Sequence, residues 1–232
     1  MTLDPAGIAP DRQVKLLAEV QSTLAKEDIL LLKLLVTNKS ILEVHYGEDL
    51  VLQALQDLEK SLAGLNSVAK LERMSPVLFA LQAKDASNSL GFMQGVRSAL
   101  RGINTSGSYR FLLNASIGAV VTDHTSSLDA EAWFGRLNLA LMKSTRTGRP
   151  ELADEKLALS ERVRQELSRL GPGSAPPEGM YWVFQPINYV ENREIYGYEA
   201  LCRWEIPGVG PVSPDMFIQV AEDLNLIQII DF

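Results

Sequence analysis

Cysteine is nearly absent from this sequence, since Cys202 is the only one among 232 residues. A single thiol cannot form a disulfide within the chain, so nothing indicates an oxidising compartment and we expect a cytoplasmic protein. No apolar run reaches the roughly 20 residues of a membrane-spanning helix, and the N-terminus lacks the apolar core of a secretory signal. We therefore predict no membrane segment in this chain, although segments outside it could anchor a longer protein.

Positive charge is also scarce. Lysine and arginine together number 22 against 29 acidic residues, which gives a formal net charge of −7. Proteins that bind the nucleic-acid backbone are usually basic, so this balance argues against nucleic acid as the main partner. The net charge does not exclude a small anionic ligand held in a local pocket. The 46% apolar content is enough for a sizeable core, and the length favours two domains.

The first part of the chain predicts a sheet covered by helices. The run "ILLLKLLV" at 29–36 is typical of a buried central strand. Two short strands at 67–71 and 77–82, joined near Pro76, predict a hairpin, and 109–122 predicts a longer strand. Apolar periodicity predicts helices at 11–26, 48–62, 86–101 and 128–145. This order favours an α/β (α+β) fold.

The second part begins with a charged segment at 151–170 that we interpret as an exposed connector helix. Its apolar stripe contains Leu159, Val163 and Leu167, and it predicts an interdomain contact or a homodimer contact. The linker "GPGSAPPEG" follows at 171–179. We expect two strands at 181–190 and 194–204, and then a helix capped by Ser213. The predicted domains are therefore 1–150 and 180–232, with a connector at 151–179.

Three motifs in the second domain resemble the opening of the EAL family of cyclic di-GMP phosphodiesterases. They are "FQPI" at 184–187, "GYEALCRW" at 197–204 and "VSPDMFIQVAEDLNLI" at 212–227. The resemblance implies that Glu199 is a ligand of Mg²⁺ or Mn²⁺ and that Arg203 contacts a substrate phosphate. Gln185 and Leu201 would line the same site. In the family, a metal-activated water attacks the phosphodiester.

The resemblance covers only the start of a (β/α)8 barrel. One carboxylate cannot hold a two-metal centre, and the family's other metal ligands and general base would lie beyond Phe232. An incomplete barrel also cannot close. We therefore expect this chain alone to be inactive and to bind no metal, whereas a full-length parent would hydrolyse cyclic di-GMP. His45 and His124 show no metal-ligand spacing, and we interpret both as structural or exposed.

The first domain resembles a GGDEF domain, the fold of diguanylate cyclases. The motifs are "DPAGIAPDR" at 4–12, "SIGAV" at 116–120 and "LNLALMKSTRTGR" at 137–149. The signature hairpin departs from the family: where the family has Gly-Gly-Asp-Glu-Phe, this sequence has Glu72, Arg73, Met74, Ser75 and Pro76. The glycines that admit a phosphate and the metal-binding carboxylates are both missing.

Other positions that the cyclase needs also differ. Residues 29–42 contain no Asp or Glu, the family's phosphate-contacting lysine aligns with Thr145, and its acidic inhibitory motif aligns with "AGLN" at 63–66. We expect a degenerate domain without cyclase activity. Three functions stay open: a regulatory module that gates an EAL phosphodiesterase, a non-catalytic cyclic di-GMP receptor, and a dimerisation scaffold that uses the 151–170 helix.

Overall fold

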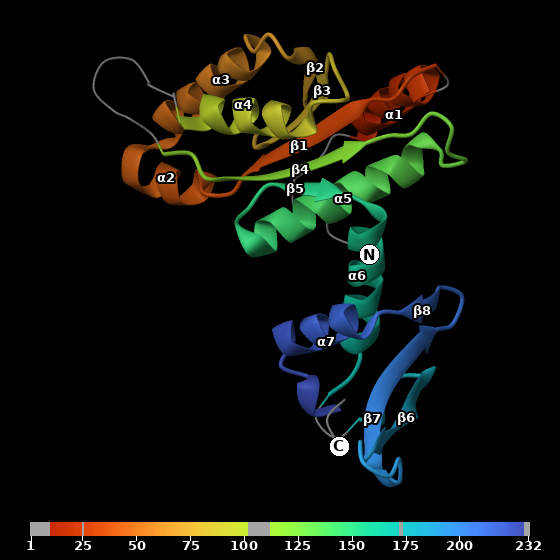
Figure 1. Cartoon of the computed structure of the whole chain (residues 1–232). Helices are drawn as coiled ribbons and strands as arrows, with labels where there is room; N and C mark the ends of the chain where they lie inside the picture. Colours follow the sequence, from red (N-terminus) through yellow and green to blue (C-terminus); the bar gives the residue numbers. More distant parts are fainter. Residues whose placement is uncertain (1–9, 25, 102–111, 172–173, 230–232) are drawn as a thin grey trace. The chain divides into compact units, whose positions relative to one another are not determined.

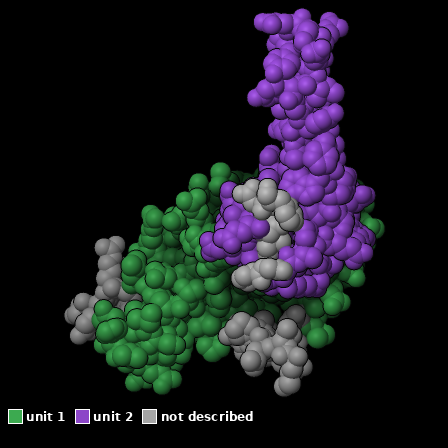
Figure 2. Space-filling model, turned by 90° about the horizontal axis from the view of Figure 1, so that it is seen from below, with its two compact units in different colours: residues 1–154 green, residues 155–232 purple. Residues whose placement is uncertain are grey.

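The computed structural model describes residues 10–24, 26–101, 112–171 and 174–229. The chain divides into two compact units, residues 1–154 and 155–232, which Figure 2 shows in green and purple. Most of the "DPAGIAPDR" motif lies outside the described residues. Within the described ranges, no helix combines the length and the apolar composition that crossing a membrane requires.

The first unit is a five-stranded sheet with helices on both faces (Figure 1). The strand order is β2-β3-β1-β4-β5; β1 is antiparallel to β3 and β4, and β5 is parallel to β4. The strands are β1 (Leu30–Val36), β2 (Val68–Arg73), β3 (Leu78–Ala83), β4 (Ala115–Val121) and β5 (Glu151–Ala153). The helices are α1 (Pro10–Leu24), α2 (Lys39–Tyr46), α3 (Glu48–Ala63), α4 (Ser89–Arg101) and α5 (Ala130–Thr147).

The central strand β1 is buried on both faces, as its apolar run predicts. Leu30, Leu32 and Leu34 join the core beneath α3 and α4, and Leu31 joins the core beneath α1 and α5. Lys33 is the polar exception, with 2% of its surface exposed. Its Nζ donates to Asn138 Oδ1 over 2.6 Å and lies 5.2 Å from the centre of the Phe134 ring. These contacts offset the cost of burying the ammonium group.

The second unit contains a three-stranded antiparallel sheet and two helices. The strands, in the order β6-β7-β8, are β6 (Met180–Asn188), β7 (Ile195–Ile206) and β8 (Gly210–Val212). The helices are α6 (Glu155–Leu167) and α7 (Pro214–Asp223), followed by the short 3-10 turn η1 (Ile227–Ile229). Trp204 and Phe217 pack edge to face, with ring centres 5.8 Å apart. The β6–β7 hairpin extends well beyond the helices of this unit (Figure 1).

The predicted helix at 151–170 needs correction. Its first residues form β5, which pairs with β4, and the helix runs only from Glu155 to Leu167. Its stripe is not exposed, because Val163 and Leu167 are fully buried in a core with Cys202 and Trp204. The helix therefore uses this stripe inside its own unit, and a second copy would have to compete with that packing.

Two further elements differ from the predictions. The sequence pattern missed α2, in which Leu42 is the buried side chain, and it missed the three-residue strands. The predicted strand at 109–122 is shorter in the structure, where β4 begins at Ala115; residues 109–111 lie outside the described part of the chain.

Candidate functional site

The β6–β7 hairpin carries all four candidate site residues of the second unit on one face. Because side chains alternate along a strand, Glu199, Leu201 and Arg203 point to the same side of β7. Three residues of β6 lie directly opposite them. The cross-strand pairs are Gln185 with Glu199, Val183 with Leu201, and Tyr181 with Arg203. We call these six residues the hairpin face.

The opposite side of the hairpin packs into the core of the unit. Cys202 and Trp204, which alternate with the site residues on β7, are 9% and 2% exposed and contact residues of α6 and α7. On the hairpin face, Gln185 and Glu199 are exposed, while Leu201 and Arg203 are half-buried. Helices thus cover one side of the sheet, and the hairpin face is the side that they leave uncovered.

Arg203 and Cys202 lie further along β7, on opposite faces of the hairpin, and differ in what they can do chemically. The Nη1 of Arg203 donates to the Cys202 carbonyl oxygen over 2.9 Å, which uses one N–H of the guanidinium. The others are suited to a phosphate, because the planar fork matches two oxygens. Burial raises the pKa of the Cys202 thiol, so this cysteine stays protonated and is a small core residue rather than a nucleophile.

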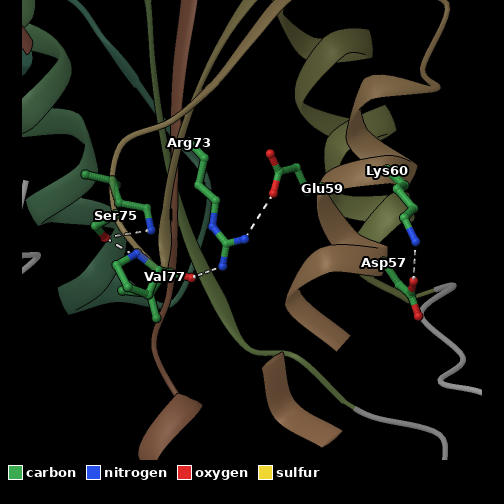
Figure 3. A network of polar contacts seen from close by, with 8 residues as sticks. Asp57, Glu59, Lys60, Arg73, Ser75 and Val77 are labelled. Atoms are coloured by element: carbon green, nitrogen blue, oxygen red, sulfur yellow. Dashed lines mark hydrogen bonds and ion pairs between the residues drawn. The ribbon is translucent and has the colours of Figure 1, made fainter. Parts of the chain in front are cut away.

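The five residues at the signature position lie at the end of β2 and in the turn that leads to β3, and Figure 3 labels Arg73 and Ser75 among them. Arg73 Nη1 contacts Glu59 Oε2 at 3.0 Å, and its Nη2 donates to the Pro76 carbonyl oxygen at 3.0 Å. Ser75 Oγ accepts from the N–H groups of Val77 and Leu78 at 3.3 and 3.1 Å. The contacts of Ser75 and of Arg73 with Pro76 stabilise the turn itself, and the contact with Glu59 joins it to α3.

Met74, the next residue of this turn, is buried. It is 1% exposed and belongs to the core beneath α1 and α5. Glu72 lies on β2, opposite Ala80 of β3. At positions 74 and 75 the turn therefore presents an apolar side chain and a hydroxyl that caps backbone N–H groups, rather than carboxylates for divalent cations.

Comparison with known proteins places both units. A family model described as "EAL domain" matches residues 177–232. The GGDEF domain of TpbB (YfiN) from Pseudomonas aeruginosa superposes with a TM-score of 0.56 at 14% identity, over 66% of this chain and 94% of that one. The first unit therefore has the fold of GGDEF domains, and residues 177–232 match the EAL domain family.

Two curated relatives match parts of this chain. PdeI of Escherichia coli, a probable cyclic di-GMP phosphodiesterase, is 46% identical over 48 residues, or 21% of this chain and 6% of that protein. MucR of Pseudomonas aeruginosa, a bifunctional diguanylate cyclase/cyclic di-GMP phosphodiesterase, is 23% identical over 195 residues, or 79% of this chain and 27% of that protein. The chain thus spans about a quarter or less of these two proteins.

Sequence reasoning missed a cavity of about 450 Å³ in the GGDEF-fold unit, where β1 ends and β4 begins. Thr145, which we predict at the position of the family's phosphate-contacting lysine, lies in its wall. The lining also includes Asn114 and two cations from α4, Arg97 and Arg101. Arg97 and Arg101 are four positions apart on α4, and residues at this spacing lie on the same face of a helix. This spacing is the sequence signal that could have predicted the pair.

A second feature lies at the opposite end of the same strands. Ligand atoms of Asp28, Asp123 and His124, all exposed, lie within 4.8 Å of one another. The His124 backbone N–H donates to Asp28 Oδ1 over 2.8 Å, and its Nδ1 is 2.7 Å from the same oxygen. These hydrogen bonds lower the pKa of the Asp28 carboxyl, and the side-chain bond raises the pKa of His124. The cluster thus ties the start of β1 to the end of β4 as an ion pair.

Proposed function

We propose that this chain belongs to a cyclic di-GMP signalling protein in which a non-catalytic GGDEF-fold unit accompanies a phosphodiesterase. The complete EAL domain of the parent protein would hydrolyse cyclic di-GMP. The observation that carries this proposal is the hairpin face: Gln185, Glu199, Leu201 and Arg203 lie together on the side that the helices leave open.

The donor set of the hairpin face fits part of a divalent-metal site. Glu199 is exposed and opposite the amide of Gln185, and carboxylate and amide oxygens suit Mg²⁺ and Mn²⁺. A bound metal would supply an activated water. Because Glu199 is the one carboxylate among the six residues, a two-metal centre requires ligands from the rest of a complete EAL domain. Arg203 would orient the substrate by holding a phosphate from the same face.

The β2–β3 turn supports the non-catalytic role of the first unit. Cyclase chemistry needs carboxylates that hold metal against GTP phosphates. In the turn, the Met74 side chain is in the core and Ser75 caps backbone N–H groups. The GGDEF-fold unit would then act on the phosphodiesterase as a regulatory domain.

The test is turnover by the full-length natural protein with Mg²⁺ or Mn²⁺, followed by chromatography of cyclic di-GMP and its linear product. We expect hydrolysis, loss of at least a hundred-fold in rate for Glu199→Ala, and wild-type rates for Glu191→Ala. Glu191 is a matched control because it is also an exposed glutamate, located in the turn of the same hairpin.

Four results would contradict the proposal. If the wild-type protein does not hydrolyse cyclic di-GMP, or if Glu199→Ala retains full activity, the phosphodiesterase assignment is wrong. Calorimetric binding without turnover would instead favour a receptor. Synthesis of cyclic di-GMP from GTP would refute the non-catalytic assignment of the first unit.

A further inference from the structure

The hairpin face contains an aromatic residue that the family motifs do not include. Tyr181 lies on β6 directly opposite Arg203, and its side chain shares a face with Gln185 and Glu199. It is 49% exposed, whereas Trp182, the next residue on the strand, points to the packed side and belongs to the rim of the core. Tyr181 therefore contributes its ring to the hairpin face.

We infer that Tyr181 is a ligand-contact residue, whose ring stacks on a guanine base of cyclic di-GMP while Arg203 holds the adjoining phosphate. This inference rests on the proposed function and extends it from the phosphodiester to the base. It adds a recognition residue on β6, four positions before Gln185.

The position along the strands supports this assignment. Arg203 lies near the carboxyl end of β7, which finishes at Ile206, and Tyr181 is its cross-strand neighbour. Cβ atoms of such pairs are roughly 5 Å apart, which is within the span of a nucleotide from phosphate to base. A ligand phosphate on Arg203 would thus bring a base to Tyr181.

Other exposed tyrosines of the hairpin do not share this position. Tyr189 and Tyr196 pack edge to face against each other near the tip, with ring centres 5.1 Å apart. Tyr198 pairs with Pro186 on the opposite side of the hairpin. Among the described tyrosines of β6 and β7, Tyr181 is therefore the one whose ring accompanies the phosphate-binding arginine.

Stacking on a base requires the aromatic ring of Tyr181 and not its hydroxyl group. Stacking of a base on an aromatic side chain typically changes affinity by about 5- to 150-fold. Tyr181→Phe keeps the ring, and we expect affinity for cyclic di-GMP within about two-fold of wild type. Tyr181→Leu keeps apolar bulk without a π-face, and we expect its dissociation constant to rise by roughly 5- to 150-fold.

The experiment uses the full-length natural protein with Ca²⁺ in place of the catalytic metal, so that binding of cyclic di-GMP is measured without turnover. Inorganic phosphate serves as a second probe, because it can contact Arg203 but has no base. Competition by phosphate should be unchanged in Tyr181→Leu and weakened in Arg203→Ala. A tyrosine-labelled sample should also show nuclear Overhauser contacts between the Tyr181 ring and the guanine H8 proton, which requires no substitution.

The outcomes separate this inference from the proposed function. If wild type does not bind cyclic di-GMP, both are wrong. If wild type binds and hydrolyses it but Tyr181→Leu binds equally well, or if the ring shows no contact with guanine, the stacking role alone is refuted. A Tyr181→Phe variant as weak as Tyr181→Leu would also refute stacking, because the hydroxyl would then be the group that matters. If Tyr181→Leu does not fold, the nuclear Overhauser contact decides.

Discussion

Gly118 offers a sharp test of how the GGDEF-fold unit is packed. It lies on the buried strand β4, paired with Lys33 of β1 and Glu151 of β5, directly beneath α5. A Cβ atom at this position would lie 2.7 Å from the Leu141 Cα and 2.8 Å from the Ala140 carbonyl carbon, and it would also overlap the Leu141 backbone nitrogen. The obstacle is helix backbone, so no side-chain rotation can relieve it.

The expected cost follows from this geometry. Overpacking a core by a methyl-sized group usually costs about 1–3 kcal/mol, and a rigid neighbour favours the upper end. Alanine also restricts the backbone of the unfolded chain, and this effect stabilises the folded state by about 0.4–1 kcal/mol. We therefore expect the free energy of unfolding of this unit to fall by about 2 kcal/mol. That is a large share of a typical domain stability of about 5–15 kcal/mol.

The matched control is Gly135→Ala, which lies on α5 itself with nothing within 4 Å of its added Cβ. Alanine is the better helix former by about 1 kcal/mol, so this variant should be as stable as wild type or more stable. Urea unfolding, with hydrogen exchange in peptides from β4 and α5, reports the GGDEF-fold unit separately. If the free energy of unfolding of Gly118→Ala lies within about 0.5 kcal/mol of the wild-type value, our description of the close packing of α5 on β4 is wrong.

Three further predictions follow from individual contacts. Phe217→Ala should destabilise the second unit by about 3–5 kcal/mol, because the ring is fully buried; tryptophan fluorescence in urea measures this. Asp129→Ala should lower the free energy of unfolding of the first unit by about 1 kcal/mol in the same assay, because the Asp129 side chain caps α5. The raised pKa of His124 gives stabilisation that is complete below about pH 6.5 and lost as pH rises through the folded pKa. The lowered pKa of Asp28 gives stabilisation that is present above about pH 3.9 and lost on acidification, so the pair is strongest between these values. In an NMR titration, Asp28→Asn should lower the His124 pKa; an unchanged value would contradict the ion pair.

The strands and long helices of the first unit could be predicted because their patterns are local. The run "ILLLKLLV" is buried on both faces, as a central strand requires, and the hairpin around Pro76 forms where the two strand patterns meet. The partner of Lys33 could not be predicted, because Asn138 is 105 residues away and no local pattern joins them. The His124 cluster escaped notice for the same reason, since 96 residues separate it from Asp28.

The stripe on α6 shows the opposite failure, a correct pattern with a wrong interpretation. Its many charges indicate an exposed helix, but charge on one side of a helix says nothing about what covers the other. The partners are Cys202 and Trp204 on β7 and the buried face of α7, which follow the linker in sequence. Likewise, motif order identified Gln185 and Glu199, but only the strand register shows that they are cross-strand neighbours and that Tyr181 faces Arg203.

The β2–β3 turn contributes to the stability of the fold at the position where the GGDEF signature is expected. A metal-binding turn must hold carboxylates out of the core, in reach of cations and phosphate. Here Met74 is inside the core, and Arg73 links the turn to Glu59 of α3 (Figure 3). An aspartate at position 74 would remove apolar packing and bring a carboxylate into an apolar environment, at a cost of several kcal/mol. A carboxylate at position 74 is therefore opposed by the packing of this core. Under the proposed function, this leaves the unit a stable regulatory role beside the EAL domain.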